Sequence, residues 1–108
     1  MNAATPGAPL RCAGNRAERP PEMTIPQMLR NSVARFDEKP AFLEKVSGEW
    51  QPISYGELNR RVSALARGLQ QLGVEKGTRI GLLSENRPEW AVTDLAAVSL
   101  GAINVPLY

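Results

Sequence analysis

Two apolar runs of this sequence are each followed by residues that could contact a ligand. Ser84, Glu85 and Asn86 come directly after the run 79–83, and the segment 106–108 closes a second run. If both runs are parallel strands, their carboxyl ends lie at one edge of a sheet, where open α/β sheets bind ligands. A hydroxyl, a carboxylate and an amide offer hydrogen bonds there. Asn86 is equally explained as the cap of a following helix, so we expect a structural role for these residues.

The residue types do not support phosphate binding, histidine-dependent nucleophilic catalysis or histidine-ligated zinc within this chain. Gly68 and Gly73 have the spacing of a phosphate-binding loop, but Val74 and Glu75 stand where that loop requires a lysine and a hydroxyl. Histidine is absent and Cys12 is the only cysteine, which excludes histidine-dependent nucleophiles and histidine-ligated zinc within this chain. The sequence therefore specifies no catalytic, cofactor-binding or metal-binding residue.

Two tryptophans and a row of arginines have both a functional and a structural interpretation. Trp50 and Trp90 could be platforms for an aromatic ligand, although single tryptophans in a hairpin and in a first helical turn more often pack. Arg60, Arg61 and Arg67 fall on the polar face of a predicted helix. A solvated face explains them more simply than a phosphate or nucleic-acid site. We predict packing for the tryptophans and solvent exposure for the arginines.

The first two helices that would position these residues begin with capping boxes. Thr24 and Gln27 precede an apolar stripe that extends to about residue 37. Ser54 and Glu57 start a longer amphipathic helix, which Gly73 is placed to end in a left-handed cap.

Between those helices, the runs 40–46 and 49–53 read as two short strands. Ser47 and Gly48 are typical of the tight turn between the strands of a hairpin. Because proline cannot donate to a ladder, Pro52 indicates that the second strand is an edge strand or ends there.

The last part of the chain predicts a strand, a helix and a second strand. The run 79–83 is typical of a strand buried on both faces. Asn86 should cap the helix, with Pro88 in its first turn, and Gly101 should end it before the extended run 102–108. This order predicts a right-handed βαβ unit with a parallel sheet. The fold class is therefore α/β, and we expect an incomplete domain whose sheet is finished by further polypeptide.

Composition limits the remaining possibilities. The 108 residues are 43% hydrophobic and 22% charged, as expected for one soluble globular unit. The proline-rich residues 1–22 predict a disordered leader, which leaves residues 23–108 as the folded part. A net charge of +2 is too balanced to indicate a nucleic-acid partner. No apolar run could span a membrane, and a single cysteine forms no internal disulfide, so we expect a reducing, cytoplasmic location.

Several segments, in this order and spacing, resemble the start of AMP-forming acyl-CoA synthetases. Two of them, with N-R-P-E-W and G-A-x-x-V-P-L-Y patterns, are similar to the long-chain fatty acid–CoA ligase branch. The segments are 24–29, 35–36 with 39–42, 54–58, 72–77, 79–90 and 101–108. Thr78 departs from the acid that the family usually has after K-G, but it lies in a predicted turn.

The resemblance implies that residues 23–108 are the N-terminal portion of a large adenylate-forming domain. The family converts ATP, a fatty acid and CoA to acyl-CoA, AMP and diphosphate. Its phosphate loop, adenine-site segment, hinge acid and catalytic lysine have no counterpart in these residues, so no site residue is carried over. ATP, Mg²⁺ and CoA are expected to be bound by the full-length parent and none by this segment. We predict that the segment alone is inactive and that its partner is the rest of the synthetase domain.

Two alternatives stay open from the sequence. Another adenylating ligase, which forms acyl-AMP or loads a carrier protein, would share this opening scaffold. The chain could also be a noncatalytic binding module that docks through exposed apolar helix faces. Fatty substrates leave peripheral membrane association open as well.

Overall fold

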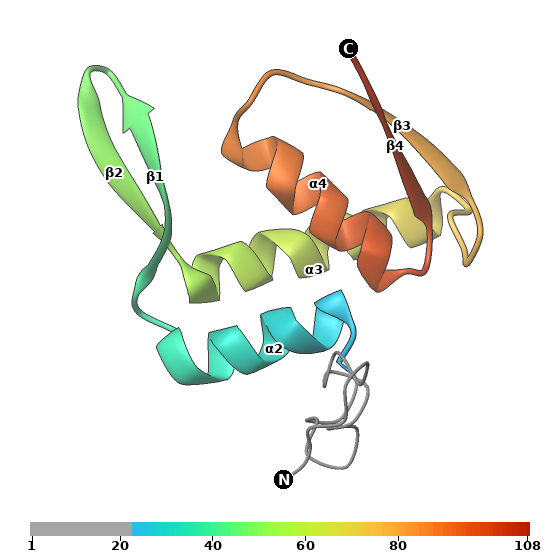
Figure 1. Cartoon of the computed structure of the whole chain (residues 1–108), viewed down its shortest axis with the longest axis horizontal. Coiled ribbons are helices and arrows are strands. Elements are labelled where there is room, and N and C mark those ends of the chain that lie inside the picture. The colour runs from blue at the N-terminus through green and yellow to red at the C-terminus, as the bar shows by residue number, and fades with distance from the viewer. Residues whose placement is uncertain (1–22) are drawn as a thin grey trace, which may run out of the picture.

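The computed structural model describes residues 23–108, and the predicted disordered leader 1–22 lies outside them. In chain order the elements are α2 (Ile25–Phe36), β1 (Pro40–Val46), β2 (Glu49–Ser54), α3 (Tyr55–Gln71), β3 (Arg79–Leu83), α4 (Pro88–Ser99) and β4 (Ile103–Leu107) (Figure 1). The strands form one antiparallel pair, β1–β2, and one parallel pair, β3–β4. The predicted α/β fold with a hairpin and a βαβ unit is confirmed.

Helix α2 starts with the predicted capping box. The Gln27 N–H donates to Thr24 Oγ1 at 3.3 Å, and the Thr24 N–H donates to Gln27 Oε1 at 2.9 Å. These reciprocal bonds satisfy amides that have no partner within the helix. The apolar stripe of α2 turns inward at Leu29, which is buried.

The β1–β2 hairpin also matches the sequence prediction. Ser47 and Gly48 have φ values of 51° and 85°, and a type I′ turn requires positive φ at both central residues. Pro52 lies within β2, opposite Leu43 of β1. Its missing amide is tolerated because β2 is an edge strand of this two-stranded sheet.

The start of α3 is held by its own cap and by the end of α2. Ser54 Oγ accepts a hydrogen bond from the Glu57 N–H at 3.1 Å, as predicted. The Gly56 N–H donates to the Asp37 carbonyl at 2.9 Å. This approach is so close that a Cβ at Gly56 would collide with the Asp37 carboxylate. A glycine at this position therefore leaves room for the Asp37 side chain beside the start of α3.

The second half of the predicted capping box at α3 is wrong. The Glu57 carboxylate accepts hydrogen bonds from the Nε atoms of Arg61 and Arg60, both at 3.0 Å. Residues three and four positions apart lie side by side on a helix, so this pairing competes with the cap. The hydrogen bonds from Arg61 and then Arg60 lower the pKa of Glu57 below its ordinary value of 4.5. Both arginines are exposed, as predicted.

The predicted cap of α4 is also wrong, by one residue. Arg87 occupies the N-cap position in an extended conformation and makes no side-chain cap bond, and the helix begins at Pro88. Proline disfavours a helical conformation in the residue before it and suits the first helical position. Pro88 therefore sets the start of α4, and Asn86 lies outside the helix. At the other end, Gly101 follows the helix with a φ of 73°.

The two strands of the βαβ unit run parallel in full register, from Arg79 opposite Ile103 to Leu83 opposite Leu107. Helix α4 connects them and packs against both. The prediction that β3 is buried on both faces is wrong for the described chain, because Leu83 is 74% exposed. Only the face of the sheet that meets α4 is covered by residues 23–108.

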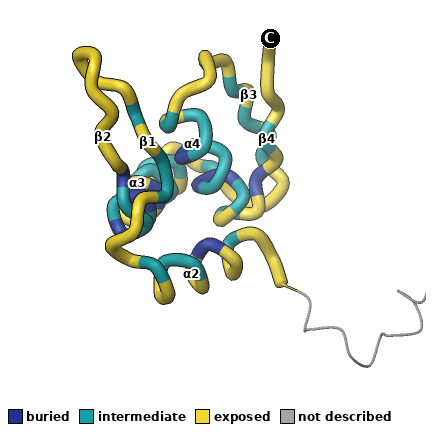
Figure 2. The backbone as a smooth tube through the Cα atoms, turned by 60° about the vertical axis from the view of Figure 1, so that its left-hand side comes forward, coloured by how far each residue is buried: buried dark blue, intermediate teal, exposed yellow. Residues whose placement is uncertain are grey.

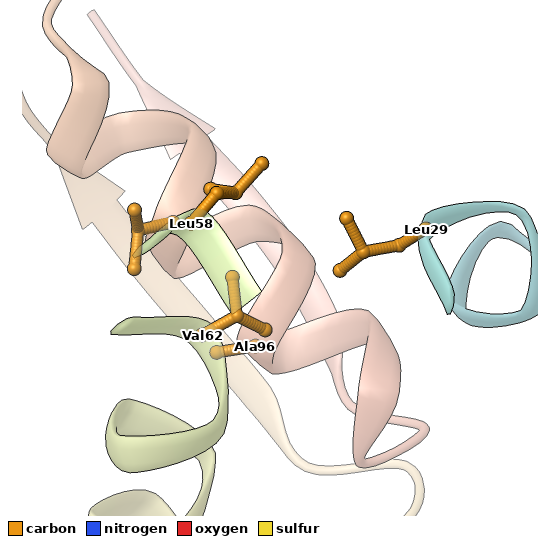
Figure 3. Packing of buried hydrophobic residues seen from close by; sticks show 5 residues of the cluster. Leu29, Leu58, Val62 and Ala96 are labelled. Atoms are coloured by element: carbon orange, nitrogen blue, oxygen red, sulfur yellow. The ribbon is translucent and has the colours of Figure 1, made fainter. Parts of the chain in front are cut away.

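The hydrophobic core lies between the helices. Leu29 of α2, Leu58 and Val62 of α3, and Val92 and Ala96 of α4 form one buried cluster (Figure 3). In Figure 2 buried segments concentrate on the helices, whereas the hairpin tip and the carboxyl end of β4 are exposed. The helices thus hold the hairpin and the βαβ unit in fixed positions.

Candidate functional site

The carboxyl ends of β3 and β4 meet, as expected of parallel strands. They border a hollow of about 380 Å³. Its lining comes from both segments selected in the sequence, together with a tryptophan of α4; the residues are Ser84, Asn86, Trp90, Pro106, Leu107 and Tyr108. The structure therefore brings Ser84, Asn86 and the segment 106–108 together at one edge of the sheet, whereas Glu85 does not line the hollow.

A second hollow of similar size lies between the hairpin and the first turn of α4. It shares Asn86 and Trp90 with the first hollow and adds residues from β1 and β2. The full lining is Phe42, Leu43, Trp50, Asn86, Arg87, Pro88, Trp90 and Ala91. Trp90 therefore lies between two open hollows, the first of which is lined mainly by apolar surface.

Two of the polar groups around these hollows are engaged with near neighbours. Ser84 Oγ donates to the Glu85 carbonyl at 2.9 Å. The Arg87 guanidinium forms an ion pair with Glu89 at 2.9 Å. Within residues 23–108 no group of three His, Cys, Asp or Glu side chains could hold a metal ion. The arrangement can bind apolar surface, but it provides no activated nucleophile and no acid–base pair.

The two tryptophans differ in their surroundings. Trp50 is 64% exposed, and Lys45 Nζ lies 5.7 Å from its ring centroid. The packing role predicted for Trp50 is therefore wrong within the described chain. Trp90 is half-buried beside the core of α4, which agrees with its predicted packing role.

Sequence reasoning missed the contribution of the hairpin to the second hollow. Phe42 and Leu43 reach it because the helices place β1 opposite the first turn of α4, and no local pattern encodes that position. Arg87 was also missed, although a residue that precedes proline at a helix start has a recognisable signature.

Comparison with known proteins identifies the family. A model of the family described as "AMP-binding enzyme" matches residues 29–108. The chain belongs to this family.

Relatives in this AMP-binding family carry ligase names. The human protein "Long-chain-fatty-acid--CoA ligase ACSBG2" is 33% identical over 86 residues, which are 80% of this chain and 13% of that protein. The "Long-chain-fatty-acid--CoA ligase FadD15" of Mycobacterium tuberculosis is 38% identical over 63 residues, 58% of this chain and 10% of that protein. This chain thus spans 10% to 13% of the length of these two relatives.

Several solved structures share the fold. A Mycobacterium tuberculosis fatty acyl CoA synthetase has a TM-score of 0.71 at 29% identity, with 79% of this chain and 16% of that chain covered. The N-terminal subdomain of Klebsiella oxytoca NpsA has a TM-score of 0.68 at 28% identity, with 80% and 22% covered. An artificially fused adenylation–PCP di-domain NRPS, NpsA-ThdA from Klebsiella oxytoca, has a TM-score of 0.70 at 29% identity, with 79% and 16% covered.

The comparisons confirm the predicted resemblance and the interpretation as part of a larger synthetase domain. Among the helices of residues 23–108, none is both long and apolar enough to cross a bilayer.

Proposed function

We propose that this chain is the N-terminal segment of a long-chain fatty acid–CoA ligase, an enzyme that converts a fatty acid, ATP and CoA to acyl-CoA, AMP and diphosphate. The proposal is carried by one observation: relatives with that name match 58% to 80% of this chain at 33% to 38% identity.

In this proposal the segment contributes scaffold rather than chemistry. The hollow at the carboxyl ends of β3 and β4 is lined mainly by apolar surface, and Arg87 beside the second hollow is paired with Glu89. Binding of ATP, Mg²⁺ and CoA is therefore assigned to other parts of the ligase, and residues 1–108 alone are expected to be inactive.

A second candidate is an adenylating enzyme that loads a carrier protein. It is favoured by the likeness to NpsA-ThdA, a fused adenylation–PCP di-domain with nearly the same TM-score and identity as the fatty acyl CoA synthetase. The opening scaffold is common to both enzymes, so the acyl substrate must separate them.

The test is to express the whole gene product that contains this segment and to measure ATP–pyrophosphate exchange with separate acids. Exchange with palmitate, followed by palmitoyl-CoA formation when CoA is added, is the expected result. Exchange with an aryl or amino acid only would favour the carrier-loading enzyme. No exchange with any acid would contradict both candidates. Exchange catalysed by purified residues 1–108 would overturn the scaffold assignment.

A further inference from the structure

A third hollow lies where helices α2, α3 and α4 meet, and it shares no residue with the two hollows described above. Its volume is about 180 Å³. Leu29 and Val62, which belong to the buried helical core, form its floor (Figure 3). Pro26 and Ala66 extend this apolar surface. We call this place the three-helix hollow.

The rim of the three-helix hollow is polar. Arg30 and Ser63 are exposed, and Asn59 is half-buried. Among the described residues, these three side chains enter no hydrogen bond and no ion pair with one another or with a neighbour. A fourth rim residue, Ser99, is engaged, since its Oγ donates to the Leu95 carbonyl at 2.7 Å. Three hydrogen-bonding groups of the rim are therefore available to a ligand.

These three groups favour an anion. The Arg30 guanidinium is permanently charged and only donates hydrogen bonds, and the Asn59 amide and the Ser63 hydroxyl can donate as well. None of the described residues that line the hollow is Asp or Glu. A guanidinium binds the two oxygens of a carboxylate through two parallel hydrogen bonds. An anion-binding rim above an apolar floor therefore predicts a ligand with one carboxylate and a hydrocarbon part.

The size of the three-helix hollow limits that hydrocarbon part. Pockets for drug-sized ligands have volumes of about 300–1,000 Å³. The three-helix hollow, at about 180 Å³, is smaller. It can cover only a short chain, whereas a long-chain fatty acid would leave much of its hydrocarbon in water, which is unfavourable.

We propose that the three-helix hollow binds a short-chain aliphatic carboxylate. The carboxylate pairs with Arg30 at the rim and accepts further hydrogen bonds from Asn59 and Ser63, while the hydrocarbon chain lies on Leu29 and Val62. This site is separate from the chemistry of the proposed ligase, so the inference depends on neither the acyl substrate nor the ATP site. Because the ligand contacts residues of all three helices, its binding stabilises their packing.

The test uses butyrate as the probe and the whole gene product that contains this segment. Equilibrium dialysis with radiolabelled butyrate measures the number of bound molecules and the dissociation constant. We expect Arg30→Gln to weaken one butyrate site by about tenfold or more, since a hydrogen bond to a charged group is lost. Ser63→Leu places a larger apolar side chain at the rim and should remove the same site. Inorganic phosphate, which has the charge but no hydrocarbon part, should compete poorly.

Arg67→Gln is the matched control, because Arg67 is an exposed arginine of α3 that does not line the three-helix hollow. It should bind butyrate as the wild type does, and circular dichroism establishes that each variant keeps its helices. Absence of butyrate binding, equal binding by Arg30→Gln and the wild type, or equal loss in Arg67→Gln would each overturn the proposal. Competition by phosphate as strong as that by unlabelled butyrate would overturn the assignment to a carboxylate. A protein that binds butyrate in this way but shows no exchange with palmitate would contradict the proposed function alone.

Discussion

Asn104 Nδ2 donates a hydrogen bond of 2.7 Å to Asp94 Oδ1, which ties strand β4 to helix α4 across a partly buried contact. The other side of the same amide is less well placed: Asn104 Oδ1 is buried and has no hydrogen-bond partner among the described residues. A hydrogen bond to a charged group contributes more than a neutral one, whereas an unpaired buried acceptor costs about 1–3 kcal/mol. The contact therefore fixes the position of α4 on the sheet more than it adds stability.

Substitutions of Asn104 should separate these two effects. Asn104→Ala removes both the donor to Asp94 and the unpaired acceptor, so we expect a loss of only about 1 kcal/mol in the free energy of unfolding. Asn104→Asp places a second carboxylate against Asp94 and should destabilise the chain more than Asn104→Ala does at neutral pH. Urea unfolding monitored by circular dichroism measures both. Equal stability of Asn104→Asp and the wild type would show that the hydrogen bond does not form in solution.

Two glycines of α3 offer a matched pair of opposite predictions. Gly56→Ala forces the new methyl group onto the Asp37 carboxylate, and we expect a net loss of about 1 kcal/mol. Gly68→Ala, in the last turn of the same helix, meets nothing within 4 Å and should stabilise the chain by about 0.5–1 kcal/mol. Thermal unfolding of both variants tests the pair. If both shift the unfolding midpoint upward, the close approach of Gly56 to Asp37 is not a constraint.

The local part of this fold could be predicted from sequence because neighbouring residues settle it. Thr24 with Gln27 marks the start of α2, and Ser47 with Gly48 marks the hairpin turn. Two predictions at helix starts were wrong: the Glu57 half of the α3 capping box and the Asn86 cap of α4. In each case a second local interaction competes with the predicted cap. Pro88 moves the start of α4 past Asn86 because its ring restricts the preceding residue.

The candidate site could be predicted only in part. The carboxyl ends of β3 and β4 follow from the βαβ order, so Ser84 and Tyr108 were correctly expected to lie near each other. The second hollow, to which Trp50 and Phe42 contribute, depends on how the helices pack against each other, and these helices are distant in sequence. Such packing is a property of the whole chain, and no pattern within the hairpin contains it.

Leu58 should be a principal stabilising residue of the helical core. It is 3% exposed and packs with residues of α2 and α4, so Leu58→Ala leaves a cavity that the helices can only partly close. We expect a loss of about 2–5 kcal/mol, enough to unfold a marginal domain. Leu72→Ala is the control, because Leu72 is 82% exposed and its truncation should cost less than about 0.5 kcal/mol. Similar losses for both variants in urea unfolding would contradict the helical core.

Glu57 should make the stability of the chain depend on pH. Hydrogen bonds from Arg61 and then Arg60 lower the pKa of its carboxyl in the folded chain, so the ionised form favours folding. This stabilisation is fully present above the ordinary pKa of 4.5 and is lost as the pH falls through the lowered value. At low ionic strength, the unfolding temperature of Glu57→Gln should therefore fall less steeply below pH 4.5 than that of the wild type. Glu49→Gln, at the exposed first residue of β2, is the matched control, because it removes a carboxylate that forms no ion pair within residues 23–108. Parallel curves for Glu57→Gln and the wild type would mean that Arg60 and Arg61 do not hold their hydrogen bonds to the Glu57 carboxylate in solution.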